Sequence, residues 1–314
     1  MDEKVSVIVP MYNREALISR CLDSIAAQEW PGMEIIVVDN DSSDGSMDVA
    51  LDWARRNRSN RLLVKVFSCR KRGACAARNH GLSVASGEFV IFFDSDDAMR
   101  PGLVRSAINV FRKDEKLDVV CWPCCIHKLD GTLRIPPFHP ERPMESHMIH
   151  TLLRPQGYMA RKQVFIHAGG WNEELPGWND WELGVRILLK DYRIGYVDEV
   201  LADIYAQNES ITGSDFSSKS GVWENSLDAA KEAVTASYKN EKEKRRLQRV
   251  IAYREIILAA HYSREGSEGL AKDLKTKALA SPYVKHLRRA ALLLAYAYTR
   301  QGGRGAWRLL RHLL

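Results

Sequence analysis

Three carboxylates stand within four residues, Asp94, Asp96 and Asp97, directly after the apolar run 89–93. Carboxylates this close repel one another, so a cation must offset their charge where they are crowded or partly buried. Oxygen ligands suit Mg²⁺ or Mn²⁺, and such a metal neutralises charge that develops on a diphosphate leaving group. The cluster therefore predicts a divalent metal site. A solvated acidic turn that caps the next helix is the alternative interpretation.

The pattern of the first half predicts how this cluster is positioned. Short apolar runs at residues 5–9, 34–39, 62–67 and 89–93 alternate with segments of helical spacing. This alternation is typical of an α/β fold, in which helices cover both faces of a mostly parallel sheet. The acidic cluster then lies at the carboxyl end of a strand, the edge where ligands bind in open α/β sheets.

The pattern changes in the second half. Residues 118–128 predict one further strand, and residues 129–150 predict a long loop because they contain four prolines, Pro136, Pro137, Pro140 and Pro143. A helix is expected at residues 181–189, with Asp180 suited to cap its start. Segment 208–220 is rich in Ser, Gly and Asn, and helical patterning dominates after it. We therefore expect an α/β domain at residues 1–215 and a helical region at residues 216–314.

Five segments occur in an order shared with a known family. They are 5–13 (VSVIVPMYN), 35–45 (IIVVDNDSSDG), 72–79 (RGACAARN), 92–97 (FFDSDD) and 170–183, which contains GWNEEL and WNDWEL. Together they resemble the family-2 glycosyltransferases. The resemblance implies a GT-A fold, which is Rossmann-like, and it makes residues 1–215 the catalytic domain.

The resemblance also implies roles for the acidic cluster. In relatives the first aspartate lies near the nucleotide ribose or the metal, and a later one binds the metal. Asp94 is therefore assigned to the nucleotide sugar and Asp96 to Mn²⁺ or Mg²⁺, with Asp97 as the alternative ligand because the motif shifts among relatives. Arg72 is expected beside the diphosphate, for which an arginine is chemically suited.

The family places the donor base beside the first two strands. Asp39 matches an aspartate that accepts a hydrogen bond from the ring N–H of a pyrimidine, a contact that requires an acceptor. Pro10, Tyr12 and Asn13 follow the first strand, where relatives pack backbone and ring atoms around the same base. Asp41 either contacts the ribose or caps the following helix.

The WNDWEL segment carries the expected catalytic base. Asp180 matches the aspartate that removes the proton of the acceptor hydroxyl, although Asn179 replaces the acidic neighbour usual in relatives. Trp178 is expected to line the sugar pocket, since aromatic faces stack on sugars. Relatives often place a histidine after the last strand as a further metal ligand, and this sequence has Asn208 there.

The C-terminal segment 285–314 interleaves lysines and arginines with leucines and contributes to a net charge of +6. Such a segment either lies on an anionic membrane surface or docks on its own domain with its basic face in water. No apolar run reaches the roughly 20 residues of a spanning helix. With no secretory signal at its start, the chain is expected to be cytoplasmic, either free or peripheral on the inner face of the plasma membrane.

The resemblance implies an enzyme of the hexosyltransferase class. It would transfer one sugar, with inversion, from a nucleotide-sugar donor, expected to be a UDP-sugar, to a glycan or lipid-linked acceptor in cell-surface polysaccharide assembly; no nucleic acid partner is expected. A sugar nucleotidyltransferase is an alternative, but no GxGxRM-like phosphate loop follows Val9. A catalytically inactive nucleotide-sugar-binding protein is another, and loss of the acidic cluster or of Asp180 would mark it. Both are present.

Overall fold

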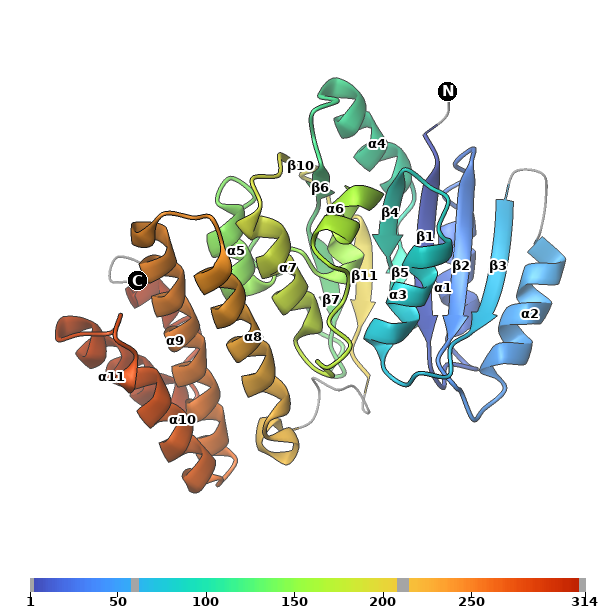
Figure 1. The fold of residues 1–314 in the computed structure, drawn as a ribbon. Helices are drawn as coiled ribbons and strands as arrows, with labels where there is room; N and C mark the ends of the chain where they lie inside the picture. Colours follow the sequence, from blue (N-terminus) through green and yellow to red (C-terminus); the bar gives the residue numbers. More distant parts are fainter. Residues whose placement is uncertain (1–2, 58–61, 208–214, 311–314) are drawn as a thin grey trace. The chain divides into compact units, whose positions relative to one another are not determined.

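The computed structural model describes residues 3–57, 62–207 and 215–310. The chain divides into two compact units, residues 1–207 and residues 208–314. The first unit is mixed α/β, and the described part of the second is helical (Figure 1). The predicted α/β fold followed by helices is thereby confirmed.

A seven-stranded sheet is the centre of the first unit. Its order is β10-β6-β9-β4-β1-β2-β3, and every neighbouring pair is parallel except the two that β9 makes. The strands are β1 (Val5–Met11), β2 (Met33–Asp39), β3 (Leu62–Ser68), β4 (Phe89–Phe92), β6 (Val119–Cys121), β9 (Tyr158–Arg161) and β10 (Ile194–Tyr196). In Figure 1, β1, β2 and β3 lie side by side in blue.

Helices cover both faces of this sheet because its central strands are mostly apolar. β1 and β2 are buried at every residue, as expected for strands packed on both sides. Val7 and Val9 share one core, whereas Ile8 belongs to the opposite core, because successive strand residues face opposite sides. The first core includes α1 (Ile18–Ala26), α2 (Ser46–Asn57) and α4 (Leu103–Lys113), and the second includes α3 (Ala74–Val84), α6 (Lys162–His167) and α7 (Asn179–Leu189).

The first strand runs farther than predicted and contains Pro10. The Ile8 carbonyl accepts from the Phe93 amide at 2.9 Å, just after the last β1–β4 pair. The nitrogen of Pro10 also faces β4, but it lies beyond the last β1–β4 pair. The N–H that proline lacks would therefore have no partner in the sheet. Pro10 is therefore a buried strand residue, and its predicted place in a loop is wrong.

The strand predicted at residues 118–128 is two strands in different sheets. β6 ends at Cys121, and β7 (Cys124–His127) joins a four-stranded sheet of order β5-β11-β7-β8. The break falls at Trp122 and Pro123, where the proline has no N–H to donate. The Trp122 indole instead donates to the Gln156 carbonyl at 2.8 Å. The remaining strands are β5 (Ala98–Met99), β8 (Leu133–Arg134) and β11 (Ala202–Tyr205).

The segment predicted as a loop at residues 129–150 also contains regular structure, β8 and α5 (Pro143–His150). Pro143 stands at the start of α5, where a fixed φ and a missing N–H are tolerated. His147 fixes α5 on the rest of the unit. Its Nε2 lies 2.8 Å from the Trp181 carbonyl, and its Nδ1 accepts from the Leu153 amide at 3.1 Å.

The described part of the second unit is built around its longest helix, α9 (Glu241–Arg264). Ile251 and Ile256 of α9 are buried, as are Trp223 of α8 and Leu292 of α11. The other elements are η2 (Phe216–Lys219), α8 (Val222–Ala236), α10 (Glu268–Ala280), α11 (Leu287–Arg300) and α12 (Trp307–Leu310). Among the described helices of the chain, none is long and apolar enough to cross a membrane.

Candidate active site

Two loops are bonded together at the carboxyl ends of β1 and β2. Asn13 adopts a left-handed conformation with φ of 50°. Its backbone N–H donates to Ser42 Oγ at 2.9 Å, and its Oδ1 accepts from the Ser43 amide at 2.8 Å. Tyr12, beside it, is 48% exposed. The predicted base-binding residues Tyr12 and Asn13 thus lie on a fixed loop at the ligand-binding edge of the sheet.

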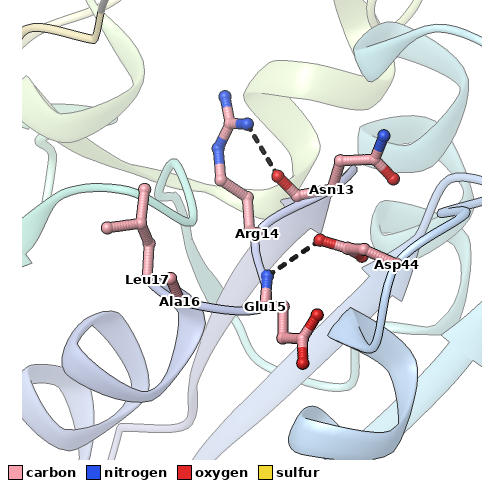
Figure 2. A pocket seen from close by; sticks show the side chains of 6 residues that line it. All are labelled: Asn13, Arg14, Glu15, Ala16, Leu17 and Asp44. Carbon is pink, nitrogen blue, oxygen red and sulfur yellow. Dashed lines mark hydrogen bonds between the residues drawn. The ribbon is translucent and has the colours of Figure 1, made fainter.

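A hollow of about 470 Å³ opens beside these loops and is lined by Asn13, Arg14, Glu15, Ala16, Leu17 and Asp44 (Figure 2). The Glu15 amide donates to Asp44 Oδ2 at 3.2 Å, which Figure 2 shows as a dashed line. Arg14 Nη1 donates to the Asn13 carbonyl at 3.0 Å. The hollow is therefore lined by positive, negative and neutral polar groups, which suit a hydrophilic ligand.

Asp39 ends β2 and is 4% exposed. Its Oδ2 accepts from the Ser42 amide at 3.2 Å. Its Oδ1 is buried and has no hydrogen-bond partner among the described residues. Because a buried carboxylate oxygen without a donor is unfavourable, this atom would gain most from a ligand N–H.

Asp41 and Arg72 pair on the surface. Arg72 Nη2 donates to Asp41 Oδ2 at 3.2 Å, with the two side chains 76% and 52% exposed, respectively. Helix α2 begins only at Ser46, whose amide donates to Asp44 Oδ1 at 3.0 Å. The helix-capping alternative for Asp41 is therefore wrong, because Asp44 supplies that oxygen. Contact of Asp41 with a ribose and of Arg72 with a diphosphate stay predictions.

Two side chains hold Asp94. Arg78 Nη2 donates to its Oδ1 at 2.7 Å, and Gln156 Nε2 donates to its Oδ2 at 2.6 Å. The Arg78 side chain is 7% exposed, and its guanidinium lies 4.3 Å from the centre of the Trp171 ring. Burial alone would lower the pKa of Arg78, but the charge of Asp94 raises it. The guanidinium therefore stays charged inside the site.

Asp97 is the most buried of the three aspartates, with 2% exposure. Its Oδ1 accepts from the Tyr205 amide at 2.8 Å, and its Oδ2 accepts from Gln156 Nε2. Burial, together with the charges of Asp96 and Asp94, raises the pKa of Asp97 well above its ordinary value. Because both oxygens are occupied by protein donors, Asp97 connects the cluster to β11 and to the short helix η1 (Pro155–Gly157).

Among the described residues, the Asp96 carboxylate has fewer protein donors than the carboxylates of Asp94 and Asp97. Its carboxylate pairs with Arg14 Nη2 at 3.4 Å, and its side chain is 17% exposed. Arg20 donates to its backbone carbonyl. Burial and the charge of Asp94 raise the pKa of Asp96, while Arg14 opposes the shift. Of the three carboxylates, Asp96 thus combines access to solvent with a single long ion pair.

Asp180 lies in the first turn of α7, which begins at Asn179. It is therefore a helical residue and not the cap, a position taken by Trp178 with φ of 46°. Arg78 connects this turn to the acidic cluster, because its Nη1 donates to Asn179 Oδ1 at 3.3 Å. Burial raises the pKa of Asp180, opposed by the Trp181 amide and by the charge of Arg78. The predicted base thus stands beside the predicted metal site, with Trp178 half-buried next to it.

A second group of side chains has ligand spacing. Among the described residues, Cys125, His127 and Asp203 bring their ligand atoms within 4.8 Å of one another. However, Arg100 donates to both oxygens of Asp203 at 2.8 and 2.9 Å, and His127 Nε2 lies 2.7 Å from Asp203 Oδ1. This group is therefore satisfied without an ion. The six cysteines of the chain are all free and buried.

Three residues of the site, Gln156, Arg14 and Arg20, had no predicted role. Gln156 bridges Asp94 and Asp97 from a Pro-Gln-Gly turn 59 residues beyond the cluster. No motif surrounds that turn, so only the three-dimensional structure reveals the contact. Arg14 directly follows Tyr12 and Asn13, and that position was the available signal. Asn208 lies outside the described residues.

Comparisons with known proteins identify relatives of part of the chain. The family model described as "Glycosyl transferase family 2" matches residues 6–161. A poly(ribitol-phosphate) beta-glucosyltransferase of Bacillus spizizenii is 36% identical over 37% of this chain and 18% of its own length. A GalNAc(5)-diNAcBac-PP-undecaprenol beta-1,3-glucosyltransferase of Campylobacter jejuni is 35% identical over 41% of this chain and 40% of its own length. The chain thus spans less than half of either relative.

A solved structure shows the same fold over most of the chain. The crystal structure of S. aureus TarS residues 1–349 in complex with UDP-GlcNAc superposes with a TM-score of 0.73, covering 96% of this chain and 92% of that one at 22% identity. At this identity the likeness establishes the fold, and the expected GT-A fold is confirmed. With its N-terminal half matching the family model, the chain belongs to glycosyl transferase family 2.

Proposed function

We propose that this protein transfers a single sugar from a UDP-sugar to a glycan or lipid-linked acceptor, with inversion, in the assembly of cell-surface polysaccharide. Family membership supports the reaction class. The named relatives act on polyol-phosphate and lipid-linked acceptors, and the TarS structure contains UDP-GlcNAc, which supports the substrate classes.

Asp39 carries the proposal for the donor. Its Oδ1 is a buried acceptor without a donor among the described residues, at the end of β2 beside the loop of Tyr12 and Asn13. The N3–H of uracil is a donor that can satisfy this oxygen, whereas N3 of cytosine is an acceptor and would face it unfavourably. The site should therefore discriminate between the two pyrimidines.

Asp96 is the proposed ligand of Mn²⁺ or Mg²⁺, with Asp94 oriented by Arg78 and Gln156 beside it. The donor set fits such an ion, because it consists of carboxylate oxygens whose pKa values are raised, at Asp96 and Asp97, by burial and mutual repulsion. A bound ion would neutralise negative charge on the departing diphosphate. The firm bonds of Asp97 to Tyr205 and Gln156 favour an anchoring role for it.

Asp180 is the proposed general base. The acceptor hydroxyl oxygen forms the new bond to the anomeric carbon, its proton passes to the Asp180 carboxylate, and the sugar–phosphate bond breaks with its electron pair leaving on the nucleoside diphosphate. A half-buried carboxylate with a raised pKa is a better base than an exposed one. Arg78, between Asp94 and the first turn of α7, fixes the distance between the donor side and the base.

Calorimetric titration with UDP and CDP in the presence of Mn²⁺ tests the donor proposal. The wild type should bind UDP more tightly than CDP by about tenfold, and Asp39→Asn should lose most of that preference because its amide can donate to cytosine N3. Asp41→Asn, a matched change at an exposed carboxylate two residues away, should keep it. Tighter binding of CDP by the wild type, or an unchanged preference in Asp39→Asn, would contradict the proposal. Release of UDP from a panel of UDP-sugars then identifies the sugar.

A further inference from the structure

The second unit contains a pocket that the proposed reaction does not use. Its volume is about 430 Å³, and it lies between α9 and the segment that leads into α11, elements labelled in Figure 1. The lining residues are Arg245, Arg249, Pro282, Tyr283, Lys285 and Arg288. Every one of them belongs to the second unit.

The charge of this pocket is one-sided. Arg245, Arg249, Lys285 and Arg288 are cations, and none of the six lining residues is acidic. Arg245 and Arg249 also stand one turn apart on α9, a spacing at which like charges destabilise a helix. Burial, followed by the charges of Arg288 and Arg246, lowers the pKa of Arg249. The lining residues therefore present positive charge that would attract an anion.

We propose that this pocket binds a phosphate group carrying two or more negative charges, such as a phosphomonoester or a diphosphate. Guanidinium groups bind the planar array of phosphate oxygens through paired N–H donors, and three of the four cations are arginines. Tyr283, whose side chain carries a neutral donor, belongs to the same lining. The pocket volume accommodates such a group together with part of the molecule that bears it.

Two sources can present this chemistry, a soluble phosphate ester and a phospholipid headgroup. The surface of α11 makes the second source relevant. Leu287 and Leu294 are 68% and 69% exposed, and their spacing of seven places them on one face of the helix. Helix α11 also buries Ala291, Leu292 and Ala295, so it docks within its own unit, while Leu287, next to the lining residue Arg288, and Leu294 stay exposed.

The test uses the full chain and sodium pyrophosphate as the probe, with EDTA present so that metal-dependent binding at the acidic cluster is suppressed. Arg245→Gln with Lys285→Gln removes two exposed lining cations, which should leave folding intact. Lys272→Gln with Arg304→Gln removes the same charge from exposed positions of the second unit outside the pocket. Titration calorimetry should give about tenfold weaker binding, or more, for the pocket variant and a change below about twofold for the control.

Co-sedimentation with phosphatidylcholine vesicles, with or without phosphatidic acid, separates the two sources. Retention on phosphatidic acid that the pocket variant loses and the control keeps would identify a headgroup. Pyrophosphate binding without vesicle retention would identify a soluble phosphate ester. No pyrophosphate binding by the wild type, or equal affinities in all three proteins, would overturn the proposal. Because the donor site is unaltered in every variant, this result is independent of the test with UDP and CDP.

Discussion

Replacing Gln156 by leucine removes a side chain that donates to two members of the acidic cluster. Gln156 is 4% exposed, and its Nε2 donates to Asp94 Oδ2 at 2.6 Å and also to Asp97 Oδ2. A hydrogen bond to a charged group contributes about 1.5–3 kcal/mol to stability. Water can replace the bond at Asp94, which is 31% exposed, but not at Asp97, which is 2% exposed. We therefore expect Gln156→Leu to lower the free energy of unfolding by about 2–4 kcal/mol at pH 7.5.

The loss should depend on pH in a defined direction. Both hydrogen bonds stabilise charged carboxylates, so their removal raises the folded-state pKa of Asp97 further above its unfolded value. A carboxyl group with a raised folded-state pKa loses stability as pH rises, because the folded state resists ionisation. The penalty of Gln156→Leu should therefore be smaller at pH 5 than at pH 7.5, and Mn²⁺-dependent binding of UDP should weaken at pH 7.5.

Gln28→Leu is the matched control. Gln28 is also 4% exposed and also donates twice from its Nε2, but to the backbone carbonyls of Ser24 and Arg100, both at 3.0 Å. Urea denaturation from pH 5 to 7.5 should show a loss for Gln28→Leu that barely changes with pH, with UDP binding retained. If the two variants lose the same free energy at every pH, or if Gln156→Leu binds UDP with Mn²⁺ as the wild type does, the reasoning is refuted.

Three further changes test separate parts of the structure. Asp96→Asn should abolish metal-dependent UDP binding in calorimetry without lowering the melting temperature, and wild-type binding would disprove its role as ligand. Asp180→Asn should keep donor affinity and lower kcat by about 10² or more, whereas near-normal turnover would exclude a general base. Although burial alone would raise it, hydrogen bonds from Lys65, Ser6 and Ser86 lower the pKa of Glu34 from 4.5 to about 2. Glu34→Gln should therefore cost about 3 kcal/mol at pH 7, a difference that shrinks as pH falls from about 4.5 toward 2 in urea denaturation; a constant difference would contradict this.

The parts of the fold that could be predicted are those set by local pattern. The strands ending at Met11 and Asp39 are mostly apolar, and short apolar runs of this kind are typical of strands buried on both faces. The strand predicted at residues 118–128 failed because both halves are apolar, and the choice of a different sheet for β7 depends on pairing with β11, more than 70 residues away. The loop predicted over α5 failed because Pro143 was counted as a helix breaker, although at the first helical position it is compatible with a helix.

The candidate site likewise contains residues that the sequence could predict and residues that it could not. Asp94, Asp96 and Asp97 could be predicted because they are close in sequence, and Asp39 because it ends a strand and matches an aspartate of the family. Gln156 could not be found, since its contacts cross 59 residues or more. The reason for proposing Asp96 rather than Asp97 as the metal ligand was also beyond the sequence. It rests on the Tyr205 amide, which belongs to β11 and donates to Asp97 Oδ1.

The arrangement of charges at the acidic cluster explains why it would favour a ligand that brings both signs. Arg14 lies 3.4 Å from Asp96 and also lines the hollow beside β1, so a cation bound at Asp96 would free this guanidinium for an anion. A metal ion alone would place positive charge beside Arg14, and a diphosphate alone would place negative charge beside three carboxylates. Arg14 repels the metal ion and the carboxylates repel the diphosphate, whereas the metal ion and the diphosphate attract one another. A metal–diphosphate pair satisfies both sets of groups at once, which is the condition under which metal and nucleotide bind cooperatively.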